Sequence, residues 1–253
     1  MVYSIIYTLV IYNMKFLYYL AAFGADNVHI KYDILLHNLN YIYNNIKEKF
    51  SIVINFYTIS NEIKAAIRQL NFIENTYFYE KVGILTELFL TNPYNNEIYN
   101  YDYILFTLDD VKIINIDILN MIEIKKKHKI QILSPKIINS THPFMYIYDN
   151  LTIHNFLEVY MLLLSPLDFD TFCSIHTIEN KWMWGVDLLF GYYNIKACVI
   201  NPYVVNHVFP SITYRSDAAD MCNEYMRKYT KYTNFEHIKN DYYAVSQKID
   251  NYL

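Results

Sequence analysis

The sequence predicts an α/β fold with a mainly parallel central sheet that is flanked by helices. Three observations support it. From residue 15 onward, runs of β-branched and aromatic residues alternate with segments whose apolar residues recur at helical spacing. The runs at 16–23 and 51–57 are almost wholly apolar, as in strands buried on both faces. With 253 residues and 54% hydrophobic content, the chain can bury one core. We expect a single domain over 14–253, after an extension over 1–13.

The first half of the chain supplies the parallel part of the sheet. Residues 16–23 are expected to form a strand that ends at Gly24. Leu35, Leu39 and Ile42 fall on one helical face, which predicts an amphipathic helix over 31–49. The elements expected next are a strand at 51–57, a weaker helix at 61–70, a short strand at 77–79, a helix at 83–90, a turn at 92–94 and a strand at 103–106.

The second half predicts a more mixed arrangement. In order, we expect a helix at 116–128, a strand at 130–133, strands near 145–148 and 156–163, a helix at 167–177, and strands near 197–200 and 203–207. Ser216 is suited to cap a helix, with Asp217 and Asp220 in its first turn. We therefore expect a helical C-terminal tail from about residue 216.

Charge and motif content argue against several classes of protein. The net charge is −4, and the only basic run, at 125–129, suits the solvated end of a helix, so we expect no nucleic-acid partner. The chain contains no G-x-x-x-x-G-K-[ST], G-x-G-x-x-G or G-x-S-x-G motif, which leaves P-loop, dinucleotide-binding and serine-hydrolase functions unsupported.

Cysteine content and the N-terminal residues bear on location. Cys173, Cys198 and Cys222 are too few and too irregularly spaced for a disulfide framework or a zinc site. A reducing, cytoplasmic compartment is expected, with the lumen of the secretory pathway as the alternative. Residues 1–23 are largely apolar, but Lys15 interrupts them, so we expect no membrane anchor there.

Two acidic residues, Asp109 and Asp110, follow the strand expected at 103–106. Open α/β sheets bind ligands at the carboxyl ends of their strands. Carboxylate oxygens suit Mg²⁺ or Mn²⁺, and a cation held there can neutralise a leaving diphosphate. A helix cap or a surface turn would also explain the pair, and the pair alone leaves both interpretations open.

A second acidic residue lies beside both tryptophans of the chain. Trp182 and Trp184 come directly before Gly185 and Asp187. A carboxylate next to an aromatic surface suits a general base that takes a hydroxyl proton while a sugar stacks on the ring. An aspartate that caps a helix beside buried tryptophans is the alternative.

The ordered combination of motifs resembles the DUF707 group, whose members are assigned as glycosyltransferases by similarity. The segments that carry it are KFLYYLAAFG, YDYILFTLDD, FLEVYMLLLSP, WGVD and VVNHVFP, between Lys15 and Pro210. The resemblance implies a GT-A fold and the transfer of a sugar from a nucleotide-diphosphate sugar, with a UDP-sugar favoured. It also implies Mn²⁺ or Mg²⁺ as cofactor, and a hydroxyl of a glycan or other molecule as acceptor.

Matched to this pattern, Asp110 and His207 become metal ligands, and Asp109 supports the metal or faces the ribose. Leu108 stands where the pattern has its first acid, so the acidic motif is incomplete. A catalytically weakened protein that binds nucleotide sugar or glycan is therefore the alternative function. A metal-dependent nucleotidyl enzyme is a further alternative; it needs basic residues for a triphosphate, and only Lys81 is expected nearby.

The resemblance makes Asp187 the catalytic base, with Glu158 as an acceptor-binding residue or as the base instead. An inverting displacement is expected, and a retaining one stays open. The residues expected to contact the nucleotide sugar are Ala22, Phe23, Gly24, Tyr57, Thr58, Lys81, Gly83, Leu108 and Asp109. Those expected to contact the acceptor are Trp182, Trp184, Gly185 and Glu158.

Overall fold

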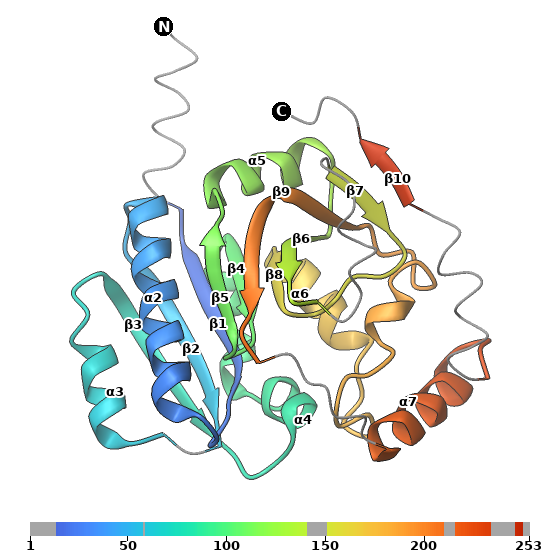
Figure 1. Ribbon diagram of the computed structural model, residues 1–253, viewed down its shortest axis with the longest axis horizontal. Helices are drawn as coiled ribbons and strands as arrows, with labels where there is room; N and C mark the ends of the chain where they lie inside the picture. The colour runs from blue at the N-terminus through green and yellow to red at the C-terminus, as the bar shows by residue number, and fades with distance from the viewer. Residues whose placement is uncertain (1–13, 58, 141–150, 210–215, 234–245, 250–253) are drawn as a thin grey trace, which may run out of the picture.

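A central sheet with helices on both faces forms the body of the protein (Figure 1). The computed structural model describes residues 14–57, 59–140, 151–209, 216–233 and 246–249. Within these residues the sheet has ten strands, in the order β10-β7-β9-β6-β8-β4-β1-β2-β3, with β5 paired to β9.

The parallel half of the sheet lies at one side and matches the sequence expectation closely. Its four strands are β1 (Phe16–Phe23), β2 (Phe50–Phe56), β3 (Ile73–Glu80) and β4 (Tyr103–Thr107), paired in the order β3-β2-β1-β4. The segments between them form α2 (Val28–Ile46), α3 (Asn61–Arg68), α4 (Leu85–Leu90) and the 3-10 helix η1 (Pro93–Asn100). Strand β3 is longer than the predicted 77–79.

The other half of the sheet is mixed, because antiparallel pairs join β4 to β8, β8 to β6, and β9 to β5 and β7. The sheet is therefore less uniformly parallel than predicted. The elements of this half are β5 (Val111–Asn115), α5 (Ile118–Lys127), β6 (Ile132–Ile138), β7 (Leu151–His154), β8 (Met161–Leu164), α6 (Pro166–Ser174), the 3-10 helix η3 (Asp187–Leu189), β9 (Ala197–His207), α7 (Ser216–Tyr229) and β10 (Ser246–Ile249).

Several predictions for this half are corrected. Strands β5, β7 and β10 were not predicted, and the strand expected at 156–163 is confined to 161–164. The two strands expected at 197–200 and 203–207 are one strand, β9, whose register against β6 shifts midway. The strand expected near 145–148 lies outside the described residues. The expected helical tail is confirmed over the length of α7.

Successive side chains of β1 point to opposite faces of the sheet and contact different helices. The hydroxyl of Tyr18 interacts with Asn38 of α2. The next residue, Tyr19, donates from its hydroxyl to Asn95 of η1 at 2.9 Å, on the opposite face. Its ring packs against Phe169 of α6, with centroids 5.0 Å apart. Helix α2 therefore covers one face, and α6 and η1 lie on the other.

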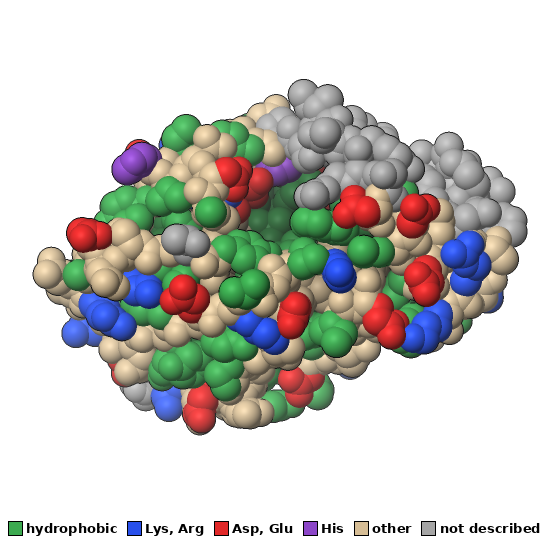
Figure 2. All heavy atoms as spheres, turned by 90° about the horizontal axis from the view of Figure 1, so that it is seen from below, with side chains coloured by type: hydrophobic (Ala, Val, Ile, Leu, Met, Phe, Trp, Pro, Cys, Tyr) green, Lys and Arg blue, Asp and Glu red, His purple; other side chains and the backbone are tan. Residues whose placement is uncertain are grey.

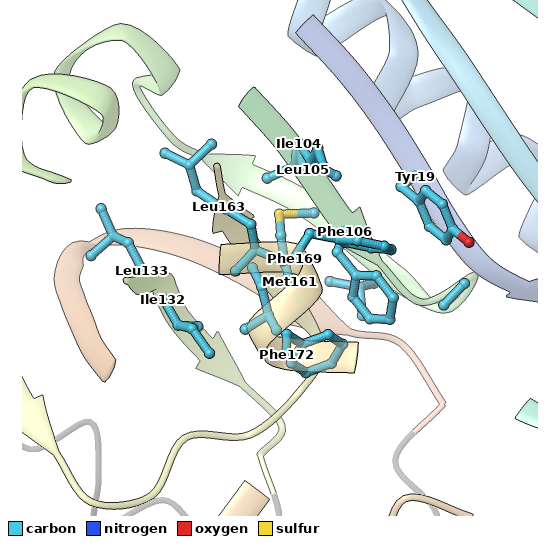
Figure 3. Close-up of a cluster of buried hydrophobic side chains, with 14 of the residues drawn as sticks. Tyr19, Ile104, Leu105, Phe106, Ile132, Leu133, Met161, Leu163, Phe169 and Phe172 are labelled. Atoms are coloured by element: carbon cyan, nitrogen blue, oxygen red, sulfur yellow. The ribbon is translucent and has the colours of Figure 1, made fainter. Parts of the chain in front are cut away.

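An aromatic cluster fixes α6 against β4 (Figure 3). The ring centroids of Phe106 and Phe172 are 5.1 Å apart, and those of Phe106 and Phe169 are 6.4 Å apart. All three rings are almost completely buried, and each such burial stabilises the fold by about 2 kcal/mol. The carboxyl end of β4, where the acidic pair begins, is thus held by a rigid core.

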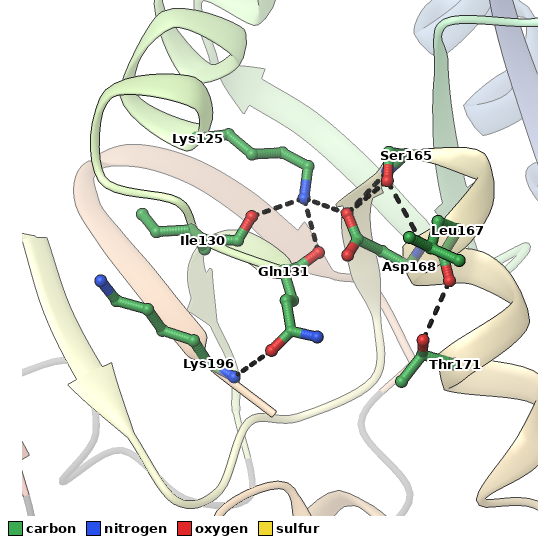
Figure 4. A network of polar contacts seen from close by, with 8 residues as sticks. All are labelled: Lys125, Ile130, Gln131, Ser165, Leu167, Asp168, Thr171 and Lys196. Carbon is green, nitrogen blue, oxygen red and sulfur yellow. Dashed lines mark hydrogen bonds and ion pairs between the residues drawn. The ribbon is translucent and has the colours of Figure 1, made fainter. Parts of the chain in front are cut away.

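A buried ion pair connects α5 to α6 (Figure 4). The Lys125 ammonium donates to Asp168 Oδ2 at 2.6 Å and to the carbonyl oxygens of Ile130 and Gln131 at 2.7 and 2.6 Å. Asp168 also closes a capping box with Ser165 at the start of α6. The expectation that the basic run is solvated is therefore wrong for Lys125, because its three donors each find a partner in the interior.

In the part of the chain that the structure describes, no helix has both the length and the apolar character needed to cross a bilayer. Cys173, Cys198 and Cys222 are free thiols.

Candidate functional site

The first candidate residues meet at the edge of the sheet where β1 and β4 end. These strands pair in parallel, with Leu20 opposite Thr107, so Gly24 and the acidic pair that follow them emerge side by side. The view from below in Figure 2, toward the face where the β2 and β9 arrows of Figure 1 point, shows a hollow. Hydrophobic side chains surround this hollow, with acidic side chains and a histidine at its rim. Parallel sheets bind ligands at this edge.

Asp110 and His207 are in contact, although 97 residues separate them. The Nε2 atom of His207 lies 3.0 Å from Oδ2 of Asp110. Strand β5 creates this contact, because Val111 pairs with His207 and the Val208 N–H donates to the Asp110 carbonyl at 2.8 Å. Asp110 Oδ1 and His207 Nδ1 are buried, and neither has a hydrogen-bond partner among the described residues.

The donor set of this pair suits a divalent cation. A carboxylate oxygen is a ligand for both Mn²⁺ and Mg²⁺, and the imidazole nitrogen suits Mn²⁺ better than the harder Mg²⁺. The unpartnered Asp110 Oδ1 has no other described role. Among the residues that the structure describes, no group of three His, Cys, Asp or Glu side chains is placed to hold a metal. Mg²⁺ sites commonly use one or two carboxylates and leave the other positions to water and substrate phosphate. The pair fits a site of that kind.

Asp109 lies on the β1 side of the turn and is already engaged. Its Oδ2 accepts from the Gly24 N–H at 2.6 Å and lies 3.0 Å from the Lys31 ammonium, which also pairs with Asp26 at 3.0 Å. Burial raises the pKa of Asp109, against the opposing effects of Lys31 and the Gly24 N–H. A Cβ on Gly24 would lie 2.6 Å from the Lys31 nitrogen. A side chain here would therefore displace the Lys31 ammonium from its position beside Asp109.

A second pair of carboxylates, Glu158 and Asp187, also comes together. Glu158 is 2% exposed and accepts a short hydrogen bond from the Ser140 hydroxyl. Asp187 begins η3, where its carbonyl accepts from the Leu157 N–H at 3.1 Å. Burial, followed by the negative charge of Glu158, raises the pKa of Asp187 to about 7. A carboxylate with such a pKa can exchange protons near neutral pH.

One short segment connects the two pairs. The ring of Tyr160 packs on His207 with centroids 4.4 Å apart, and its carbonyl accepts from the Leu108 N–H at 3.1 Å. Two residues earlier, Glu158 interacts electrostatically with Asp187. The Asp110–His207 pair and the Glu158–Asp187 pair therefore flank the same segment, directly before β8.

Helix α7 packs over the tryptophan-containing segment. Gly185 has a φ of 81°, and a Cβ at this position would overlap the Cys222 sulfur on α7. Trp182 Nε1 donates to Asp217, also on α7, at 3.1 Å. Trp184 is 38% exposed and could present a ring to a sugar. Trp182 therefore contributes to the packing of α7.

The residues predicted around Lys81 form a polar group among themselves. Lys81 pairs with Glu87 at 2.9 Å and donates to Thr91 at 3.0 Å, and a Cβ on Gly83 would lie 2.7 Å from the Glu87 carboxylate. Burial, with the charges of Asp109 and Glu87 as smaller causes, raises the pKa of Tyr57 to about 12. Tyr57 thus lies in the field of Asp109, while Lys81 is neutralised by its own neighbour.

The other predicted donor contacts differ in accessibility. Ala22 and Phe23 end β1 and are 9% and 0% exposed, so Phe23 can offer only backbone to a ligand. Leu108 is half-buried in the turn after β4. Thr58 lies outside the described residues.

Sequence analysis did not identify Lys31, Ser140 or Tyr160. Lys31 could have been noticed, since it lies in the first turn of α2, where the helix dipole disfavours a cation and a specific anionic partner is expected. Ser140 and Tyr160 have no comparable signal. Their positions depend on the pairing of β8 and β9 with distant strands.

No family model matches the sequence, and no curated protein matches it. Three solved structures resemble the fold. A structure of GalNAc-T7 with UDP, GalNAc and Mn²⁺ has a TM-score of 0.61 at 7% identity; the match covers 91% of this chain and 50% of that one. A structure of TarS from S. aureus gives 0.57 at 13% identity, over 91% and 42% of the chains. TarS residues 1–349 in complex with UDP-GlcNAc give 0.57 at 13%, over 91% and 71%.

The chain thus spans about half of the GalNAc-T7 structure and less than half of the first TarS structure. At these identities the resemblance establishes the fold. It is a mixed α/β domain of the GT-A type, with a central sheet flanked by helices.

Proposed function

We propose that this protein is a metal-dependent glycosyltransferase that moves a sugar from a nucleotide-diphosphate sugar, with a UDP-sugar favoured, to a hydroxyl of a glycan or other acceptor. The contact between Asp110 and His207 at the ligand-binding edge of a GT-A-like sheet is the observation that supports it most strongly. Solved structures with this fold include one that contains UDP, GalNAc and Mn²⁺ and one that contains UDP-GlcNAc.

In this proposal Asp110 and His207 would hold Mn²⁺ or Mg²⁺ beside the donor diphosphate. The bound cation would neutralise the charge that grows on the diphosphate as it leaves. Oδ1 of Asp110 is the protein atom best placed for this role, because it is buried without a described partner. A metal bond to this oxygen would supply the partner that it lacks among the described residues.

Asp187 is the proposed general base. The acceptor oxygen bonds to the anomeric carbon while the bond from that carbon to the diphosphate breaks, and the hydroxyl proton passes to the Asp187 carboxylate. Attack on the face opposite the diphosphate inverts the anomeric configuration. A pKa of about 7 keeps much of the base ionised at neutral pH and makes it a stronger proton acceptor than an ordinary aspartate.

Glu158 and Trp184 complete the proposed acceptor side. Glu158 is held by Ser140 and lies near enough to raise the pKa of Asp187, so we assign it to tuning that base. Trp184, with its ring partly exposed beside Gly185, would stack on the sugar face of the acceptor.

A binding protein without turnover is the second candidate, and it is favoured by Leu108 at the position of the first acid. Calorimetric titration of UDP-sugars and GDP-sugars, with and without Mn²⁺, followed by a measurement of UDP or GDP release, separates the two. Metal-dependent binding with release of the nucleotide supports the enzyme. Binding without release supports the alternative, and no binding contradicts both.

A nucleotidyl enzyme acting on a triphosphate is less well supported. Lys81 and Lys31, the lysines found near the proposed donor site, are paired with Glu87 and with Asp26 and Asp109. We also propose that the protein is cytoplasmic, that it belongs to the DUF707 group and that residues 14–253 form one domain.

A further inference from the structure

We infer that Lys31 keeps Asp109 out of the metal's coordination shell, so that the protein alone offers the cation only Asp110 and His207. A divalent cation would then bind tightly only together with the donor diphosphate. This inference rests on the proposed function and assigns Lys31 as a positioning residue that acts through Asp109.

The first support is the geometry around Asp109. Its Oδ2 atom is shared by the Gly24 N–H at 2.6 Å and the Lys31 ammonium at 3.0 Å, and both donors lie on the β1 side of the site. The carboxylate is therefore fixed toward β1 and α2. Asp110 instead contacts His207 at the end of β9. The two consecutive carboxylates thus have partners on different elements: Asp109 on α2 and the residue after β1, and Asp110 on β9.

The second support is the burial of the pair. The side chains of Lys31 and Asp109 are 8% and 13% exposed, whereas that of Asp26 is 77% exposed. Asp26 is therefore well screened by water, and Asp109 is the main partner of the buried ammonium. Movement of Asp109 to a metal ion would leave Lys31 with only this weak partner, which opposes the movement.

The third support is the coupling between the two acids. Asp109 and Asp110 are consecutive residues in the turn after β4, so their carboxylates lie within electrostatic range of each other. Without Lys31 they would form a site with two negative charges, and such sites bind divalent cations more tightly because affinity rises with ligand charge. Lys31 thus lowers the affinity of the site for a divalent cation when no donor is bound. The negative charge of the diphosphate then supplies the attraction that Asp109 does not.

The test measures Mn²⁺ binding by the full chain, from the paramagnetic resonance signal of the free ion, with and without UDP. We expect wild type to bind Mn²⁺ weakly alone and at least about tenfold more tightly with UDP. Lys31→Met should tighten binding without UDP by about tenfold, since Asp109 becomes available as a charged ligand. Lys31→Arg, which keeps the cation, should behave like wild type, and Lys31→Met/Asp109→Asn should lose the gain.

If Lys31→Met unfolds the protein by leaving Asp109 unpaired, circular dichroism detects the loss of structure, and a second comparison covers that case. Both Asn variants are compared with UDP present. The loss of Mn²⁺ affinity in Asp110→Asn should exceed the loss in Asp109→Asn by at least about tenfold, because only Asp110 is a ligand. The inference is overturned if Lys31→Met folds and binds no more tightly, or if the two Asn variants lose equal affinity. Wild type that binds no Mn²⁺ even with UDP would contradict the proposed function itself.

Discussion

The pH dependence of turnover follows from the environment of Asp187. A general base must be ionised, so the rate at saturating donor should rise with pH and level off above the pKa of the base. With that pKa at about 7, about one tenth of the sites are active at pH 6 and about nine tenths at pH 8. We expect the rate to rise about tenfold over this interval.

Glu158→Gln tests the cause of this pKa. The amide is nearly isosteric and can still accept from Ser140, but it removes the negative charge that is the second cause of the raised pKa. Burial, the larger cause, stays. The rising limb of the pH profile should therefore move to lower pH by about one unit, without disappearing.

The assay is release of UDP from a UDP-sugar with water as the acceptor, in saturating Mn²⁺, between pH 5 and 9. Asp187→Asn should abolish the pH-dependent limb and reduce the rate by at least about a hundredfold. The reasoning is refuted if Glu158→Gln leaves the limb in place or moves it to higher pH, or if Asp187→Asn keeps the wild-type profile.

The remaining predictions concern stability. The pKa of Asp187 in the folded protein lies above its ordinary value of 3.8. Its favourable contribution to the free energy of unfolding is therefore present below pH 4 and is lost as the pH rises through 7. Asp187→Asn should therefore be as stable as wild type at pH 4 and more stable at pH 8 by up to about 2 kcal/mol, allowing for partial exposure, as urea unfolding at both pH values can show. Gly185→Ala should cost about 3 kcal/mol, from its positive φ and the overlap with α7; the control Gly83→Ala, which meets only a flexible carboxylate, should cost less than about 1 kcal/mol in the same thermal melts. Asp168→Ala should cost about 3 to 5 kcal/mol in urea unfolding, because it leaves Lys125 buried without its counter-ion.

The sequence predicted those elements whose residue pattern is visible within a single segment. The apolar runs of β1 and β2 and the periodicity of α2 are readable in single segments, and all three elements form within a few residues of expectation. Strand β5 was missed because VKIIN is short and runs directly into the apolar start of α5. It becomes a strand only by pairing with β9, almost a hundred residues away, and such pairing leaves no local signal.

The candidate site shows the same division. The ordered motifs placed Asp110 and His207 together before any geometry was known, and the two side chains are in contact. Their roles as ligands stay predictions. The Lys31–Asp109 pair could not be predicted, because it depends on the packing of α2 against the turn after β4. Motifs thus identified acidic residues at the sheet edge, while packing decides which of them is free to bind a ligand.

Calorimetric titration of UDP in Mn²⁺ tests most directly whether Asp110 and His207 hold a cation on the nucleotide. Wild type should bind UDP at least about tenfold more tightly in Mn²⁺ than in a chelator, and Asp110→Asn should lose that difference. Asp33→Asn, which removes an exposed carboxylate of α2, should keep it. Equal affinity for UDP with and without Mn²⁺ in wild type, or full Mn²⁺ dependence in Asp110→Asn, would contradict the proposed site.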